Sequence, residues 1–488
     1  MTKNIVLISF YNPKSLGLRS LESALALAGF DVTIVYFKNF NSVSPKLPTA
    51  KEFEHLKELI EQKNPFLIGF SVMTSLYLET VEHVSTELRK HFKIPMVWGG
   101  VYATMFYKKC MDFTDFVIRS EGEEAIIELA NALQAGDTNY SKIKNLAYRC
   151  EEGFVLENEL RHLLVDLDAY GLPNIGGNNK YLIEENKIVN IDPIVNSYSY
   201  EMSCSRGCLF GCSYCCAINL KQINASKGAY VRFREVDHVI DELLIAKKSI
   251  KKLKFIRFWD EIFAYDKDWV DAFIDRYKRE IKLPFEIWAH PLKCNEELIE
   301  KLCRIGLYKV VMGIQSGSPY IRKEIFNRHE TQEQIIEASN ILSRCGVPQV
   351  IYDFMLRHPF ETKETLMETY ELCKNLAGPF ELQLHGLNFL PGTNIVKKAL
   401  DMNLVSKEDM EHLMYAPMQE QYERYWQNDN KSEEMNHIYK MIYLTQYPVF
   451  KGQLEKGKNL NNLYKMAEKM TKMRYVYKKG VLVIKGSR

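Results

Sequence analysis

The stretch Cys204-Ser-Arg-Gly-Cys208-Leu-Phe-Gly-Cys212-Ser-Tyr-Cys215-Cys216 decides how the rest of this 488-residue chain is interpreted. It gathers five of the eleven cysteines into thirteen residues, and soft thiolates of this kind select zinc or iron–sulfur centres. A structural zinc site would want a fourth ligand, usually a second C-x-x-C pair or a histidine pair at finger spacing, and neither follows. Three thiolates can instead hold a cubane iron–sulfur cluster with one iron open to a substrate. Cys208, Cys212 and Cys215 supply three.

Other assignments of these cysteines stay open. Cys216 fits in place of Cys215 if the last gap has three residues, although the two-residue gap favours Cys215. Cys204 lies too early to be a ligand, so we interpret Cys204 and Cys216 as packing or supporting residues. Ordinary core cysteines are the remaining alternative.

The cysteine stretch follows the first of six candidate strands, at residues 198–202, 254–259, 285–289, 308–312, 350–354 and 381–387. Helical patterns separate these strands near residues 235–249, 267–281, 295–305, 331–345 and 362–377. Six such units predict a partial (β/α)6 barrel, whose active site lies at the carboxyl ends of its strands.

The preceding part of the chain also alternates strands and helices. Its short apolar runs, at residues 4–9, 31–36, 66–71, 96–98 and 116–118, predict a doubly wound parallel sheet of the α/β class. We therefore expect a Rossmann-like domain at 1–140, a connector with a hairpin at 141–197, the barrel at 198–393 and a mostly helical region at 394–488. The first domain could bind a nucleotide or cobalamin, or be a methylthiotransferase domain.

With Tyr214 before the last cysteine, the C-x3-C-x2-C motif resembles that of radical S-adenosylmethionine (SAM) enzymes. The resemblance implies a [4Fe-4S] cluster whose open iron binds SAM, which one electron cleaves to a 5′-deoxyadenosyl radical. Further matches are Asp260-Glu261, the G-I-Q-S-G element at 313–317, the D-x-M run from Asp353 to Thr362 and the P-G-T ending at 391–393. Gln315 replaces the usual glutamate, and Arg357 stands where glycine is common. The implied SAM contacts are Tyr214, Asp260, Glu261, Gln315, Ser316, Gly317, Asp353, Leu387 and Leu390.

The N-terminal segment is similar to the domain of cobalamin-binding radical SAM enzymes. A dinucleotide fingerprint is absent after the first strand, and methylthiotransferases would need more cysteines than Cys110 and Cys150 before the barrel. Small residues after the strands let a flat corrin approach the backbone. The implied cobalamin contacts are Asn12, Leu16, Gly17, Ser71, Val72, Met73, Thr74, Ser75, Gly99, Gly100, Val101, Tyr102, Glu121, Gly122 and Glu123.

One departure concerns the lower face of the corrin. The D-x-H-x-x-G motif, which supplies an imidazole to cobalt in many corrinoid proteins, is missing, and the loop after the first strand has no histidine. We therefore expect base-off cobalamin without a histidine ligand, its lower face covered by residues 72–76 or their neighbours.

The resemblance implies methyl transfer to an unactivated carbon of a small-molecule or peptide natural-product precursor. Alternatives are a non-methylating ring contraction, oxidation or cyclisation, or a non-catalytic corrinoid carrier or sensor. The formal charge of 64 − 62 = +2 disfavours nucleic acid as a partner. Without a long apolar run or signal peptide, we expect a cytoplasmic protein that does not bind membranes and is served by an electron donor such as flavodoxin or ferredoxin. No catalytic base is evident, although His290, His358 and His385 lie near barrel strand ends.

Overall fold

The computed structural model describes residues 3–40, 45–263, 266–426, 432–455 and 459–484. Its first sheet has nine strands in the order β7-β6-β5-β4-β3-β1-β2-β8-β9. The strands are β1 (Asn4–Phe10), β2 (Asp31–Phe37), β3 (Leu67–Ser71), β4 (Met96–Gly99), β5 (Phe116–Ile118), β6 (Leu146–Arg149), β7 (Val155–Glu157), β8 (Lys180–Glu184) and β9 (Lys187–Asn190). β1 pairs in parallel with both β2 and β3, so the strand order reverses beside it. Ligands of such sheets bind at this switch point, beyond the carboxyl ends of the strands.

Helices cover both faces of this sheet. One face packs on α1 (Leu16–Leu27) and α6 (Glu123–Ala135), and the other on α2 (Ala50–Lys63) and α3 (Leu78–His91). Local sequence explains their ends, since Thr49 and Glu52 form a capping box before α2 and Gly136 ends α6 in the left-handed conformation. Two short helices, α4 (Val101–Met105) and α5 (Tyr107–Cys110), follow β4.

The segment that we expected to be a connector adds strands to this sheet. The predicted hairpin is present as antiparallel β6 and β7, and a second hairpin, β8 and β9, extends the opposite edge. Residues 141–197 are therefore integrated into the first sheet, while the proposed division of the chain into four parts stays a prediction.

The second sheet has six strands in sequential order: β10 (Ser199–Met202), β13 (Phe255–Phe258), β14 (Phe285–Ala289), β15 (Leu307–Gln315), β16 (Gln349–Leu356) and β17 (Glu381–Gly386). Every neighbouring pair is parallel, and in the described part of the chain β10 and β17 do not pair, so the barrel is open. Its outer layer comprises α8 (Val236–Ser249), α9 (Lys267–Arg276), α10 (Glu296–Ile305), α11 (Gln332–Arg344) and α12 (Lys363–Asn375). Between β10 and α8 lie β11 (Ser205–Arg206), α7 (Cys216–Ile223) and β12 (Arg232–Phe233).

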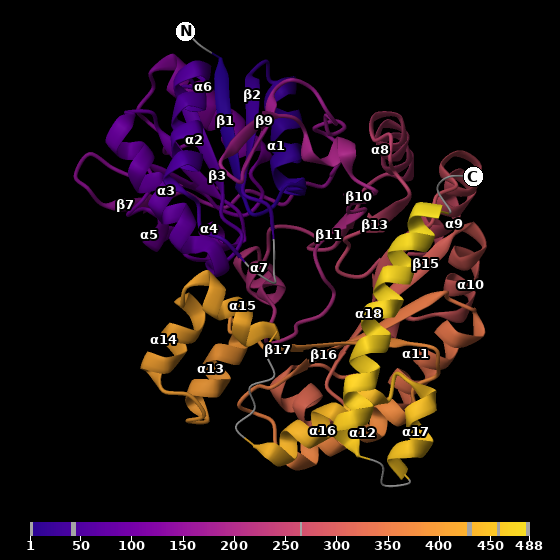
Figure 1. The fold of residues 1–488 in the computed structure, drawn as a ribbon. Coiled ribbons are helices and arrows are strands. Elements are labelled where there is room, and N and C mark those ends of the chain that lie inside the picture. Colours follow the sequence, from indigo (N-terminus) through magenta and orange to yellow (C-terminus); the bar gives the residue numbers. More distant parts are fainter. Residues whose placement is uncertain (1–2, 41–44, 264–265, 427–431, 456–458, 485–488) are drawn as a thin grey trace.

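The C-terminal region is helical: α13 (Asn394–Asp401), α14 (Lys407–Tyr415), α15 (Met418–Trp426), α16 (Glu433–Leu444), α17 (Pro448–Glu455) and α18 (Leu460–Ile484). In Figure 1 the orange helices α13–α15 lie beneath the indigo N-terminal sheet, and the yellow α18 runs along the barrel. Tyr422 of α15 joins the core of the first sheet, and Ile442 of α16 joins that of the barrel. The predicted fold class is confirmed. Within the described residues, no helix combines the length and apolarity needed to cross a bilayer.

Candidate functional site

A cavity of about 540 Å³ lies between the two sheets. From the first sheet it is lined by the loops after β3, β4 and β5 and by the start of α1, which together mark the switch point. From the barrel it is lined by β10, the β11–β12 hairpin and the end of β13, including Tyr230, Trp259 and Glu261. The carboxyl ends of strands from both sheets thus open onto one space.

Most of the residues predicted to contact cobalamin line this cavity. They are Leu16, Gly17, Ser71, Met73, Gly99, Gly100, Val101, Glu121, Gly122 and Glu123. Five others do not line it, for local reasons. Val72, Ser75 and Tyr102 are buried in the fold, the hydroxyl of Thr74 accepts from the amide of Leu76, and the amide oxygen of Asn12 accepts from the amides of Lys14 and Ser15. Those five contacts stay predictions.

The glycines of this cavity provide a surface that a flat group can approach. A Cβ atom at Gly17 would meet no described atom within 4 Å and would project into open space. Gly100 has a φ of +105°, and a Cβ there would stand 2.8 Å from the carbonyl oxygen of Val72. Only glycine fits this position without strain. The residues present therefore fit a corrin pressed against the backbone.

The loop after β3 reaches the cavity through Met73. Met73 is 43 % exposed and lines the cavity, whereas Val72 beneath it is fully buried. None of the described residues that line the cavity is a histidine. The side chains nearest the expected lower face are therefore apolar or weakly polar.

The three predicted cluster ligands lie on one loop between β11 and α7. The thiols of Cys208, Cys212 and Cys215 are partly buried, and each lies within electrostatic range of the other two. Burial raises the pKa of Cys208 to about 11 and also raises that of Cys212. Among the described residues, no three His, Cys, Asp or Glu side chains are gathered at metal-binding distance. Three neighbouring thiols on a single loop nevertheless have the chemistry of the soft donor set of an iron–sulfur cluster.

The neighbouring cysteines have other surroundings. Cys204 is buried in the core of the barrel. Cys216 begins α7, and its hydrogen bond with Cys215 lowers the pKa of Cys216 and raises that of Cys215. Cys216 therefore lies close enough to Cys215 to be the third cluster ligand in its place.

A buried arginine that we did not predict supports the cluster loop. Arg328 follows β15, and its guanidinium donates to the hydroxyl of Tyr214 at 3.2 Å and lies 3.9 Å from the sulfur of Cys212. Glu330 accepts from Arg328 at 2.6 Å, and the carbonyl of Gly313 accepts at 2.7 Å. No local motif signals the contacts with Tyr214 and Cys212, because they join residues more than a hundred positions apart.

The acidic pair after β13 divides into two roles. The carboxylate of Asp260 accepts from the backbone amide of Cys204 at 3.0 Å and from the hydroxyl of Ser205, so it fixes the start of the cluster loop. Burial raises the pKa of Asp260 to about 6. Glu261 lines the cavity, and burial raises its pKa as well.

Polar residues from three adjacent strands meet at the carboxyl end of the barrel. Asp353 accepts from His385 at 3.1 Å and lies 3.5 Å from the amide nitrogen of Gln315. Burial lowers the pKa of His385, but Asp353 outweighs this effect and the net shift is upward. Tyr425 of α15 stacks on His385 at 4.7 Å between ring centroids.

The remaining predicted SAM contacts are mostly packed. Ser316 is buried, and a Cβ at Gly317 would stand 2.2 Å from the Cα of Thr369, so this glycine permits close packing on α12. Leu387 packs in a cluster with Tyr214, while Leu390 is half-buried and its carbonyl accepts from the hydroxyl of Thr393. Their contacts with SAM stay predictions.

The two other histidines noted at strand ends are buried as well. The ring of His290 stacks on that of Phe210 in the cluster loop, with 3.8 Å between the ring centroids. His358 lies among aromatic rings that include Phe326. Burial lowers the pKa of His290 to about 2 and that of His358 to about 3, so both are neutral near pH 7.

Comparisons with known proteins match this arrangement. Residues 202–373 match the Radical SAM superfamily, and residues 5–130 match the B12 binding domain. The chain thus contains a radical SAM domain preceded by a B12-binding domain. Both matches confirm the resemblance found in the sequence. The radical SAM domain contains the cluster loop, and the B12-binding domain contains the glycine-lined loops.

The radical SAM protein is also similar to individual proteins. It is 26 % identical over 360 residues to an uncharacterised methyltransferase of Pyrococcus horikoshii, covering 72 % of this chain and 73 % of that protein. It is 22 % identical to the anaerobic magnesium-protoporphyrin IX monomethyl ester cyclase of Rubrivivax gelatinosus, covering 66 % of this chain and 56 % of the cyclase.

Among solved structures, the radical SAM methyltransferase TsrM from Kitasatospora setae, with cobalamin and a [4Fe-4S] cluster bound, has a TM-score of 0.63. This match is 18 % identical and covers 82 % of this chain and 78 % of TsrM. At this level of identity the likeness shows a shared fold.

Proposed function

We propose that this radical SAM protein is a cobalamin-dependent methyltransferase that acts on an unactivated carbon of a small molecule or peptide. The single observation that carries the proposal is the shared cavity, which loops of the B12-binding domain and of the radical SAM domain line together. The similarity to a methyltransferase over most of both chains supports it. When bound, the cofactors would supply a SAM-derived radical and a cobalt-borne methyl group.

The chain's own residues would bind and orient these groups. Cys208, Cys212 and Cys215 would hold the cluster, and Glu261, on the cavity wall beside their loop, would receive the amino group of SAM. Arg328 donates to the hydroxyl of Tyr214 and so holds this residue of the loop in place. The glycine-lined loops of the B12-binding domain would carry the corrin.

We also propose that the cobalamin is base-off, with the loop after β3 beneath it. Exposed Met73 and buried Val72 offer no nitrogen donor from their side chains. The test is electron paramagnetic resonance (EPR) of the Co(II) form. A spectrum without nitrogen superhyperfine splitting is expected, and splitting by one nitrogen would contradict the assignment.

Turnover products test methyl transfer. Anaerobically reconstituted protein, given SAM, a flavodoxin or ferredoxin reducing system and candidate small-molecule acceptors, should form S-adenosylhomocysteine together with 5′-deoxyadenosine. The Cys208→Ala variant is the control and should form no 5′-deoxyadenosine. Formation of 5′-deoxyadenosine and product without S-adenosylhomocysteine would contradict methyl transfer.

A non-methylating reaction is the second candidate, favoured by the similarity to the magnesium-protoporphyrin cyclase. In that case cobalamin would serve redox or placement only. The same product analysis separates the two proposals, because only a methyltransferase consumes one SAM as a methyl donor.

A further inference from the structure

Two acidic residues, Glu121 just before α6 and Glu123 at its first position, pair with the β11–β12 hairpin of the radical SAM domain. Glu121 accepts from Arg206 at 3.1 Å and from both terminal nitrogens of Arg232, at 2.9 and 3.1 Å. Glu123 accepts from the other terminal nitrogen of Arg206 at 2.6 Å. We call these four residues the Glu–Arg clasp.

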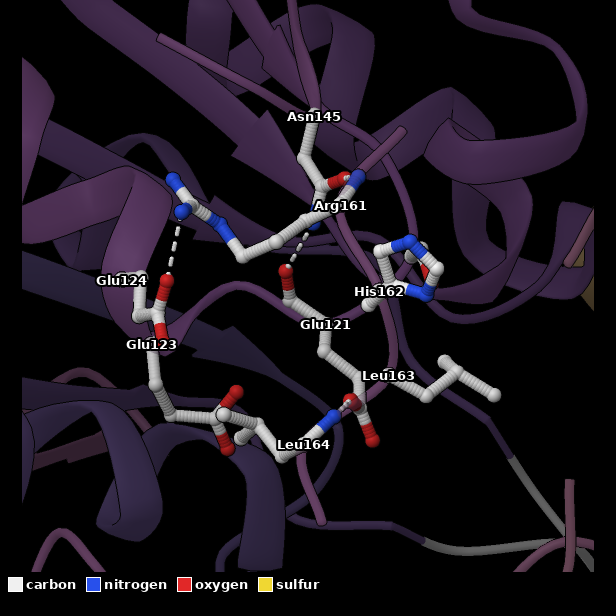
Figure 2. Close-up of a pocket in the computed structure, with 9 residues that line it drawn as sticks. Glu121, Glu123, Glu124, Asn145, Arg161, His162, Leu163 and Leu164 are labelled. Atoms are coloured by element: carbon white, nitrogen blue, oxygen red, sulfur yellow. Dashed lines mark hydrogen bonds and ion pairs between the residues drawn. The ribbon is translucent and has the colours of Figure 1, made fainter. Parts of the chain in front are cut away.

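The clasp is closed by further hydrogen bonds. The backbone amide of Leu164 donates to Glu121 at 2.7 Å, a contact drawn in Figure 2, and the hydroxyl of Ser20 donates to Glu123 at 2.9 Å. Burial opposes ionisation of Glu123, but Arg206 outweighs it and holds the pKa of this carboxyl below its usual range. Protein donors therefore engage both carboxylate oxygens of Glu121 and one carboxylate oxygen of Glu123.

The arginines of the clasp are fixed to the start of the cluster loop. Arg206 and Arg232 are directly paired in the antiparallel β11–β12 ladder. Gly207 follows with a φ of +95°, and a Cβ there would stand 2.1 Å from the carbonyl oxygen of Tyr230. Cys208 is the next residue, so the position of the clasp is transmitted through tightly packed backbone to the first cluster ligand.

We propose that Glu121 and Glu123 are positioning residues, which set the distance and orientation between the cobalamin site and the cluster through Arg206 and Arg232. The sequence predicts both acids to contact cobalamin, and their pairing with the two arginines gives them this second role. Charge-assisted, partly bidentate pairs of this kind carry geometric specificity as well as energy, particularly where water is excluded. The proposal rests on the two cofactor sites of the proposed function, but not on methyl transfer.

The test uses the Glu123→Gln and Arg206→Gln variants and their double variant, each reconstituted with iron, sulfide and hydroxocobalamin. Glu124→Gln is the matched control, because Glu124 neighbours Glu123 on α6 but pairs with Arg161 instead, as Figure 2 shows. Two properties are measured without turnover: hydrogen exchange of backbone amides 205–216, and the relaxation of the Co(II) EPR signal by the reduced cluster.

Both single clasp variants should retain iron and cobalamin, speed exchange at 205–216 by roughly tenfold, and weaken the relaxation effect. The double variant should be no worse than Arg206→Gln alone, because the Glu123–Arg206 pair is already lost in that variant. Glu124→Gln should match the wild type.

Loss of cobalamin in Glu123→Gln but not in Arg206→Gln would overturn the proposal in favour of direct cobalamin binding. Additive effects of the two substitutions, or unchanged relaxation of the Co(II) signal in both single variants, would also overturn it. If a clasp variant does not fold, Glu123→Asp and Arg206→Lys, which keep the charges, give the same comparison. If the exchange and relaxation results are as expected but no methyl transfer is found, only the proposed function is contradicted.

Discussion

Replacing Gly17 separates the cobalamin site from general stability. Gly17 is the second residue of α1 and lines the cavity, and a Cβ added there would meet no described atom. Its φ lies outside the left-handed region, so a side chain is compatible with the backbone. In the cofactor-free protein Gly17→Ala should therefore be neutral or stabilising, by up to about 0.5–1 kcal/mol.

A larger side chain should act in the opposite direction on cobalamin. Leu at position 17 would project into the space that the corrin needs, and overpacking of a filled site costs about 1–3 kcal/mol. Since each 1.4 kcal/mol is a factor of about ten, the dissociation constant for hydroxocobalamin should rise roughly 5- to 150-fold. Ala should have a smaller effect.

Equilibrium dialysis against hydroxocobalamin and urea unfolding of the cofactor-free protein measure the two quantities. Ala26→Leu is the control, because Ala26 is an exposed residue of the same helix that does not line the cavity. Cobalamin affinity equal to wild type in Gly17→Leu would refute the placement of the corrin. A matching loss in Ala26→Leu would point to a general effect on α1.

Three further predictions concern other residues. Cys208→Ala should lose the cluster iron but still bind hydroxocobalamin, whereas Cys373→Ala, in the barrel core, should keep both; equal iron in the two variants would contradict the ligand assignment. Asp192→Asn should lower the free energy of unfolding by about 3–5 kcal/mol, because it leaves the buried guanidinium of Arg19 without its bidentate partner. Burial raises the pKa of Glu361 to about 7, so its contribution to stability is complete below about pH 4.5 and is lost as the pH rises through 7. The free energy of unfolding of Glu361→Gln, relative to that of the wild type, should therefore rise by up to about 3 kcal/mol between pH 5 and pH 8. Urea unfolding at several pH values measures this difference, and a difference that does not change with pH would refute the prediction.

Local patterns explain what could be predicted from the sequence. The central strands of both sheets are short apolar runs separated by helical patterns, so the two α/β units follow from nearby residues. The β8–β9 hairpin was not predicted, because its strands KYLIE and KIVN mix polar and apolar residues. The cysteine spacing and the glycines after the strands likewise lie within single loops. The structure places these glycines on the wall of one cavity, and Ser205, Arg206 and Gly207, which directly precede the cluster cysteines, also line it.

Contacts between distant residues could not be predicted in this way. Arg328 reaches Tyr214, and Arg232 reaches Glu121, across 114 and 111 positions. The chain has many arginines and glutamates, and nothing in the sequence around Arg328 or Arg232 indicates that its side chain is buried or which partner it contacts. For the same reason Glu121 and Glu123 were interpreted from their motif, and Asp260 was assigned to SAM although it bonds to the backbone of the cluster loop.

The central claim is that the cluster and the corrin face each other across the cavity between the two sheets. The most direct measurement compares the microwave power saturation of the Co(II) EPR signal with the cluster oxidised and with it reduced. Faster relaxation on reduction, absent in Cys208→Ala, is the result expected from two paramagnets that share this cavity. Identical saturation in both states, in protein shown to contain both cofactors, would contradict the account.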